Sequence, residues 1–176
     1  MRSSWIFAIV LILVSSFSFA QTSNPPDTDS ATATCNFSDD QQLAVKYQEV
    51  TINKKQEKTF LGREVPFGKV WEPGQKPLTL FTNSPLSISG ANLAVGAYTL
   101  YLIPNRKDWT LVVSKNTDVK AAYDQSKDIV RASMEIGQLP APESKFSIYF
   151  AHTGPKECTM QVDLADTRAW VPFQQH

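Results

Sequence analysis

The sequence is poor in the residues that carry most enzyme chemistry. It has two histidines, His152 and His176, and no Gly-x-Ser-x-Gly motif, phosphate-binding loop or dinucleotide-binding glycine pattern. Nucleophilic hydrolysis needs a base beside the nucleophile. His152 lies in a His-Thr-Gly-Pro turn, where an exposed, non-catalytic histidine is the simpler interpretation. These absences argue against triad hydrolases and nucleotide-dependent enzymes, and we expect no cofactor.

An excess of charge of one sign is also missing. The chain has 17 basic and 17 acidic residues, and removing the segment that contains Arg2 leaves 16 basic against 17 acidic residues. A balance this close to zero gives no overall attraction to nucleic acid or to an anionic membrane. No basic run or basic-aromatic stripe changes that expectation, so we predict no nucleic-acid partner.

Long apolar runs are absent except near the N-terminus. Trp5 to Val14 is an apolar run of about ten residues, which follows Arg2 and is too short to span a bilayer. Ser18-Phe19-Ala20 fits the small-x-small rule for cleavage. We therefore predict a signal peptide over 1–20, cleavage near Ala20, a periplasmic or secreted protein and no stable membrane insertion. The alternative, an uncleaved anchor, needs a longer apolar core.

The residues after this segment change in composition. Residues 21–34 are rich in Ser, Thr, Asp and Pro and contain no large apolar side chain, which is typical of a flexible linker. Residues 35–176 are enough for one core, and we predict a single domain.

Cysteine is scarce as well, with Cys35 and Cys158 far apart in the sequence. Structural zinc sites draw their four ligands from closely spaced cysteines and histidines, so we predict no metal site. Disulfides persist outside the cytoplasm, and we expect Cys35 and Cys158 to form one, with Cα atoms closer than about 7 Å. Two unpaired thiols are the alternative.

Alternating apolar residues dominate the rest of the chain. The clearest pair of strands lies within 96–115, where Pro104 to Asp108 supplies the turn. The first strand is apolar on both faces, which predicts a central strand covered on both sides. Further strands are expected over 43–52, 78–82, 86–88, 130–136, 146–150, 158–164 and 169–173. The one plausible helix is 117–128, whereas 60–71 has the glycines and proline of short strands and corners. The pattern predicts an all-β fold, an antiparallel sandwich or jelly-roll-like barrel of about ten short strands.

Three segments resemble a known family. Residues 65–71 read Val-Pro-Phe-Gly-Lys-Val-Trp, residues 94–104 read Ala-Val-Gly-Ala-Tyr-Thr-Leu-Tyr-Leu-Ile-Pro, and residues 108–111 read Asp-Trp-Thr-Leu. Together they resemble the bacterial exported family known as domain of unknown function 2911, over roughly residues 43–173. The resemblance implies an all-β periplasmic or secreted domain with no established activity. The family usually continues after its tryptophan with Arg-x-Gly-x-Asn-Glu, whereas Trp71 is followed here by Glu-Pro-Gly-Gln-Lys-Pro, which keeps only Gly74.

The loop after Trp71 is the predicted ligand-binding site, because the resembling family concentrates its polar signature there. The predicted contact residues are Lys69, Trp71, Gln75, Lys76 and Arg168. We expect a small molecule, a glycan or a protein as partner. The alternative is that Trp71 packs in the core while the lysines protect a sheet edge from aggregation.

Two functions remain open at this stage. We predict a non-catalytic binding or structural module, and its alternative is a carboxylate-based hydrolase of envelope or extracellular polysaccharide. The hydrolase would use two carboxyl groups about 5–10 Å apart. Its candidates are Glu64, Glu72, Asp163 and Asp166. Asp163 and Asp166 flank a strand end beside Arg168, which favours a structural charge pair. The strand aromatics, Trp109 among them, are more typical of a core than of a sugar-stacking face.

Overall fold

The computed structural model describes residues 29–118 and 120–176. The signal peptide predicted over 1–20 and residues 21–28 of the predicted linker lie outside the described residues. Strand β1 begins at Ser30 and pairs with β2 along its whole length, so residues 30–34 belong to the sheet and not to a linker. The composition of these residues does not indicate a strand, because the inward-facing residues include Ala31 and Ala33, which are small and not strongly apolar.

All neighbouring strands are antiparallel, in the order β1-β2-β3-β6-β7-β8-β9-β4-β5. The strands are β1 (Ser30–Asn36), β2 (Gln42–Gln48), β3 (Leu78–Thr82), β4 (Leu86–Ile88), β5 (Ala91–Leu93), β6 (Gly96–Pro104), β7 (Trp109–Ser114), β8 (Asp128–Gly154) and β9 (Glu157–Gln175). This open, sandwich-like sheet confirms the all-β prediction.

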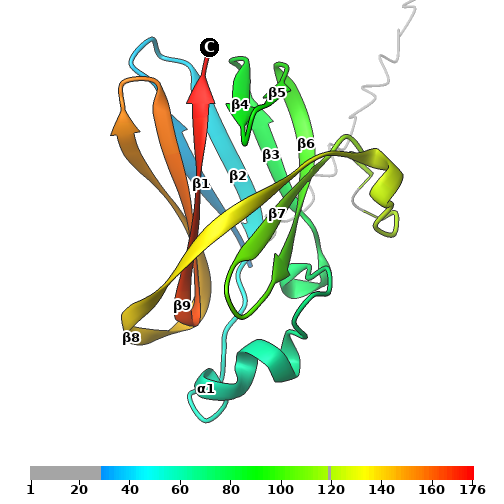
Figure 1. The fold of residues 1–176 in the computed structure, drawn as a ribbon, viewed down its shortest axis with the longest axis vertical. Helices are drawn as coiled ribbons and strands as arrows, with labels where there is room; N and C mark the ends of the chain where they lie inside the picture. The colour runs from blue at the N-terminus through cyan, green and yellow to red at the C-terminus, as the bar shows by residue number, and fades with distance from the viewer. Residues whose placement is uncertain (1–28, 119) are drawn as a thin grey trace, which may run out of the picture.

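The last two strands are much longer than expected. Strands predicted over 130–136 and 146–150 are parts of β8, and those predicted over 158–164 and 169–173 are parts of β9. The first part of β8 pairs with β7 and the remainder pairs with β9, so β8 passes from one layer of the sandwich to the other. Figure 1 shows this crossing as the yellow ribbon that runs from β7 towards β9.

The core explains why β6 is apolar on both faces. Leu100 and Leu102 face the main core, together with Trp109 and Leu111 of β7. On the opposite face, a small second cluster contains Tyr101, Ile103 and Val112 and is covered by Val70 and Tyr123. The prediction of a central strand covered on both sides is confirmed.

Of the four helical turns in the described part of the chain, only one lies within the helix predicted over 117–128. The turns are α1 (Glu57–Thr59), η1 (Phe60–Glu64), η2 (Pro73–Gln75) and η3 (Gln125–Lys127). Of the helix predicted over 117–128, only η3 is helical among the described residues, and Val119 lies outside them. Side chains compete with the helix there, because the Asn116 carboxamide accepts from the Asp118 N–H and the Asp118 carboxylate accepts from the Lys120 N–H.

The first predicted strand also ends early. β2 stops at Gln48 instead of continuing to Ile52. Beyond it the chain leaves β3 and joins β8, where Thr51 bridges Lys145 and the Ile52 N–H donates to the Ser144 carbonyl at 2.6 Å. Apolar residues alternate through Leu43, Val45 and Tyr47 and then shift by one residue to Val50 and Ile52, and the change of partner explains this shift.

Candidate functional site

Trp71, the aromatic residue of the predicted site, is half-buried and packed against the core. Its ring meets Phe146 edge-on, with centroids 5.2 Å apart, and its backbone N–H donates to the Leu102 carbonyl at 2.7 Å. Trp71 and Leu102 form an isolated antiparallel bridge, so this tryptophan anchors the loop to β6.

Lys76 lies in a groove on the sheet, called here the Lys76 groove. The groove has a volume of about 240 Å³ and is lined by Ser30, Lys46, Tyr47, Gln48, Lys76, Pro77 and Thr79. The Lys76 ammonium group donates to the Gln48 carboxamide at 3.5 Å. Lys69, Trp71 and Gln75 do not line this groove, so the structure does not gather the loop residues around one hollow.

Gly74, the residue retained from the family pattern, has a steric role. Its φ is +66°, and a Cβ there would lie 2.5 Å from Cγ of Gln48. Only glycine allows the loop to lie this close to β2. Gln75 follows at φ +61° and is exposed.

Arg168, the fifth predicted ligand residue, is paired with Asp163. Its Nε donates to Oδ1 at 2.7 Å and its Nη2 donates to Oδ2 at 2.6 Å, which is the bidentate geometry of strong ion pairs. The hydrogen bond to Asp163 raises the pKa of the guanidinium. The Asp163 side chain is 3% exposed, and the expected structural charge pair is confirmed. Both residues lie inside β9 and not at a strand end.

The other carboxyl candidates occupy separate positions. Glu64 is exposed and lies 3.9 Å from Arg63. Burial raises the pKa of Glu72, which is half-buried in the loop after Trp71. Asp166 is half-buried and accepts a hydrogen bond from the Thr167 hydroxyl at 3.0 Å.

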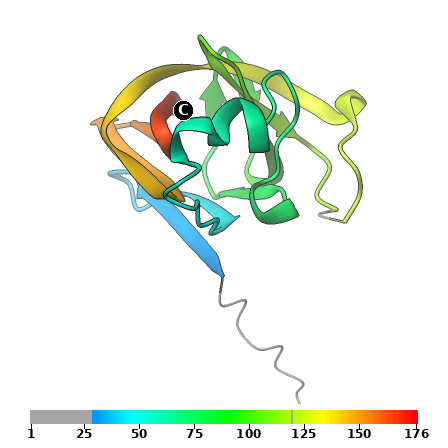
Figure 2. The same cartoon turned by 90° about the horizontal axis from the view of Figure 1, so that it is seen from below.

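A polar cleft lies at the end of the sheet that carries α1, and we call it the Trp109 cleft. It has a volume of about 270 Å³ and is lined by Lys58, Leu61, Phe67, Asn105, Arg106, Trp109, Ile136, Asp166 and Thr167. A second hollow adjoins it, sharing Ile136, Asp166 and Thr167 and adding Gly137 and Gln138. Figure 2, seen from this end, shows the helical turns lying across the strand ends. The cleft thus joins the 57–64 segment, the β6–β7 turn and the long strands.

Trp109 is the unusual group of this cleft. The side chain is fully buried, and its indole Nε1 has no hydrogen-bond acceptor among the described residues. An unpaired buried donor costs about 1–3 kcal/mol, so such groups are rare and call for an explanation.

Arg106 is held at the rim by an aromatic ring. Its guanidinium carbon lies 5.0 Å from the centroid of Phe67, within the range of a cation–π contact. The Gly68 N–H donates to the Pro104 carbonyl at 2.9 Å and ties the Phe67 segment to the β6–β7 turn. Neither Arg106 nor Lys58 has an ion-pair partner within the part of the chain that the structure describes.

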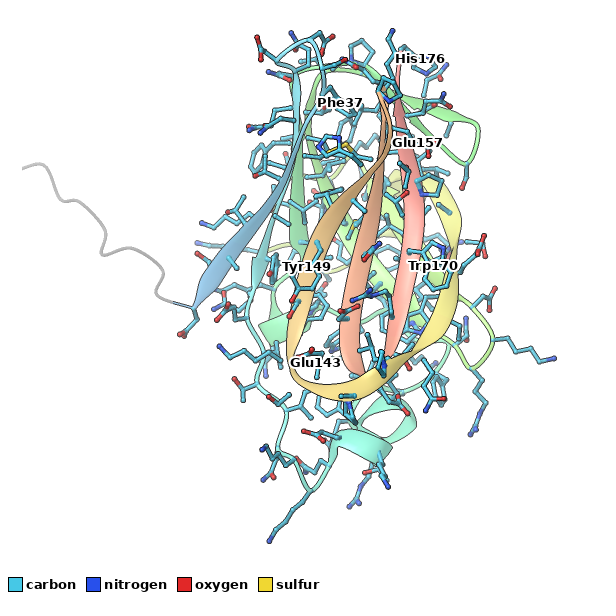
Figure 3. The ribbon with its side chains drawn as sticks, turned by 90° about the vertical axis from the view of Figure 1, so that its left-hand side faces the viewer. Phe37, Glu143, Tyr149, Glu157, Trp170 and His176 are labelled. Atoms are coloured by element: carbon cyan, nitrogen blue, oxygen red, sulfur yellow. A yellow bond between two sulfur atoms is a disulfide. The ribbon has the colours of Figure 1, made fainter. Side chains whose placement is uncertain are left out.

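Asp166 is placed by an unusual backbone. Ala165, directly before it, is fully buried with φ +56°, a conformation that costs a non-glycine residue of the order of 1–3 kcal/mol. The β8–β9 register shifts on both sides of the Glu143–Ala165 pair. This irregularity precedes the Asp166–Thr167 pair that borders the cleft. Next to it, the Trp170 ring packs on Gly137, where a Cβ would lie 3.2 Å from the ring (Figure 3).

Sequence reasoning missed this cleft. Alternation assigns Trp109 to the core, which is where its ring lies, but gives no sign of an unpaired indole N–H. Arg106 belongs to a polar turn. Turns on rigid scaffolds often carry binding residues, and this is the one feature of the sequence that points to Arg106. Asp166 was identified only as a carboxyl candidate.

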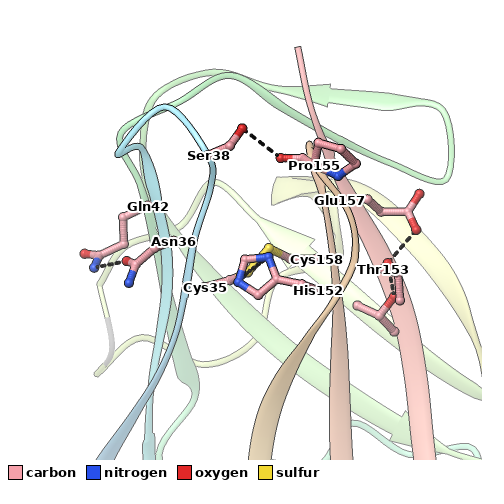
Figure 4. Close-up of a disulfide and its surroundings, with 10 residues drawn as sticks. Cys35, Asn36, Ser38, Gln42, His152, Thr153, Pro155, Glu157 and Cys158 are labelled. Atoms are coloured by element: carbon pink, nitrogen blue, oxygen red, sulfur yellow. Dashed lines mark hydrogen bonds between the residues drawn. A yellow bond between two sulfur atoms is a disulfide. The ribbon is translucent and has the colours of Figure 1, made fainter.

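The two cysteines form a disulfide covered by a histidine. Cys35 and Cys158 are bonded, with Cα atoms 6.4 Å apart, which confirms the expected reach. The His152 nitrogens Nε2 and Nδ1 lie 3.4 and 3.7 Å from Sγ of Cys35 (Figure 4). Potential ligand atoms of the three residues lie within 4.8 Å of one another. With the sulfurs bonded to each other, no thiolate is offered to a metal ion.

The comparisons with known proteins identify a family and nothing closer. Among the described residues, no helix has the length and hydrophobicity needed to span a membrane. Neither the curated proteins nor the solved structures include a significant match. Residues 28–173 match the family described as "Protein of unknown function (DUF2911)", which extends the resemblance through β1, and the chain belongs to that family.

Proposed function

We propose that this chain is an extracytoplasmic, non-catalytic binding module that takes a small polar ligand in the Trp109 cleft. The observation that carries the proposal is the buried Trp109 indole N–H, which has no acceptor among the described residues. A ligand that brought an acceptor beside the ring would recover part of the cost of leaving this donor unpaired. The volume of about 270 Å³ is slightly below the range of about 300–1,000 Å³ common for ligand pockets, which suits a small ligand.

One wall of the cleft comes from a segment that contains no fully buried residue. The nitrogen is shielded from solvent, so an acceptor reaches it only when neighbouring side chains shift. Lys58 and Leu61 come from α1 and η1, neither of which contains a buried residue. Segments with few buried contacts open at low cost in free energy, which supports entry from this side.

The location rests on two features that point the same way. The N-terminal pattern of Arg2, a short apolar run and Ala20 is typical of a cleaved signal peptide. A disulfide between distant cysteines is typical of oxidising compartments.

The absence of catalysis is part of the proposal because the cleft is poor in carboxyl groups. Glycosidases of the carboxylate type use two carboxyl groups that flank the scissile bond. Among the four candidates, only Asp166 lines the Trp109 cleft, and Asp163 is engaged by Arg168. A hydrolase would need a partner for Asp166 that the cleft lining lacks.

The proposal is tested by mapping amide shifts in ¹⁵N-labelled protein during titration with three sugars: D-glucose, N-acetyl-D-glucosamine and D-glucuronate. We expect saturable shifts at residues 105–109 and 166–167 with at least one sugar. The Arg106→Ala variant should weaken them, and Lys76→Ala, in the separate groove, should not. Shifts confined to the Lys76 groove, or no saturable shift with any of the three, would overturn the proposal.

A further inference from the structure

We infer that the ligand of the Trp109 cleft presents a carboxylate on a polyhydroxylated body, as the uronic acid unit of a glycan does. This inference rests on the proposed function and names the chemical class of its ligand.

The donors around the cleft define the group that they would bind. Trp109, Arg106 and Lys58 line the cleft, and their polar groups are an indole N–H, a guanidinium and an ammonium group. All three groups donate hydrogen bonds and accept none. The complementary group is one that only accepts, and an ionised carboxylate has two such oxygens.

Arg106 is prepared to bind such a group. The Phe67 ring holds the guanidinium from one side, so the side chain loses less freedom when it binds. A planar guanidinium recognises carboxylates through two parallel hydrogen bonds. Because Arg106 has no ion-pair partner among the described residues, no internal contact has to be broken first.

The balance of charge favours a singly charged group. The cleft lining contains two positive side chains, Lys58 and Arg106, and one negative side chain, Asp166, so its net charge is +1. A carboxylate neutralises this charge, whereas a doubly charged phosphate would exceed it and face Asp166 as well. The inference is therefore a carboxylate and not a phosphate.

The adjoining hollow accounts for the rest of the ligand. Asp166 is shared by both hollows, and Gln138 and Thr167 add a carboxamide and a hydroxyl. These groups offer both donors and acceptors, which is what the hydroxyls of a sugar require. The apolar side chains of Leu61 and Ile136 also line the cleft and suit the C–H face of a sugar ring.

The test compares D-glucuronate with D-glucuronamide, which has the same body but no charge, by the amide shifts of residues 105–109. We expect glucuronate to bind at least about tenfold more tightly, as is typical when a charge-assisted hydrogen bond is lost. Acetate should bind weakly, because it lacks the hydroxyls, and inorganic phosphate should not shift these residues.

Matched variants locate the effect. Arg106→Ala should abolish the preference for glucuronate, and Arg106→Lys should reduce it. Lys107→Ala removes the same charge from the next residue, which is exposed and does not line the cleft, and should leave the preference intact. The variants are compared only when their spectra retain the dispersion of the folded protein.

The outcomes separate the two proposals. Equal affinity for glucuronate and glucuronamide, or a preference for phosphate, would overturn the carboxylate inference while leaving a binding site in the cleft. If D-glucuronate, D-glucose and N-acetyl-D-glucosamine all fail to shift residues 105–109, both proposals fall. Tight binding of acetate alone would contradict the inference of a sugar and support the inference of a carboxylate.

Discussion

The guanidinium of Arg168 binds the buried carboxylate of Asp163 through two hydrogen bonds of 2.7 and 2.6 Å. The pair joins two positions of β9 beside the bulge at Ala165. Since the carboxylate is almost fully buried, this contact neutralises a charge that would otherwise be costly inside the sandwich.

Arg168→Met should therefore lower the free energy of unfolding by about 2–3 kcal/mol, less than the 3–5 kcal/mol typical of a fully buried pair, because Arg168 is partly exposed. The double variant Asp163→Leu/Arg168→Met should be more stable than Arg168→Met alone, since it removes the orphaned charge. Urea denaturation followed by circular dichroism measures both. A double variant that is less stable than the single one would show that the unpaired Asp163 carboxylate is not the source of the loss in Arg168→Met.

His152 should protect the disulfide from reduction. The ring is exposed while both cysteines are buried, so it lies on the solvent side of the bond. His152→Ala should speed reduction by a small dithiol several-fold, because a thiolate can then approach the sulfur directly. Timed alkylation and mass spectrometry follow the rate, with His176→Ala as the control. Slower reduction in His152→Ala would instead show that the imidazole assists the leaving thiolate.

Gly74 gives a stability prediction with an internal control. Gly74→Ala should cost about 2 kcal/mol or more, because it combines backbone strain at positive φ with contact against Gln48. Gly90 also has positive φ, at +80°, but no atom lies within 4 Å of its added Cβ. Gly90→Ala should therefore cost only the strain, about 1–2 kcal/mol. Equal losses in thermal denaturation would show that the Gln48 contact relaxes freely.

The raised pKa of Tyr123 should lower the free energy of unfolding at alkaline pH. Burial, followed by the hydrogen bond to Asp128, raises its pKa from 10.0 to about 12. A raised pKa means that the folded state holds the proton more firmly, so the resulting stability is complete below pH 10 and is lost as the pH rises towards 12. Tyr123→Phe should show a shallower fall in stability over that interval. An identical slope in both proteins would contradict the assignment.

The sequence predicts those strands in which apolar and polar residues follow a regular local pattern. Alternation from Cys158 to Leu164 predicted that part of β9, and the two apolar faces of β6 predicted its central place. The length of β8 was hidden by Pro140 and Pro142, which lie where its register with β9 shifts between Gln138 and Glu143. Prolines are tolerated at such irregularities, so they did not end the strand.

The site could not be predicted in the same way. The Trp109 cleft brings together a helical turn, a hairpin turn and the bulge before Asp166, which are far apart in the sequence. No local periodicity encodes their meeting. The lack of an acceptor for the Trp109 indole is likewise a property of the packed structure. The sequence indicates the loop after Trp71 because the resembling family concentrates its polar signature there, and the one residue of that signature kept here, Gly74, has a steric role.

The indole N–H resonance of Trp109 shows most directly whether this group binds the ligand. Of four tryptophans, Trp5 lies in the predicted signal peptide, which leaves Trp71, Trp109 and Trp170 to give three indole signals in ¹⁵N-labelled mature protein. Trp71→Phe and Trp170→Phe assign the third signal to Trp109. On saturation with D-glucuronate, we predict that the Trp109 signal moves downfield, as a new hydrogen bond requires, while the other two change little. A Trp109 signal that stays in place at saturation would contradict the claim that this donor receives the ligand.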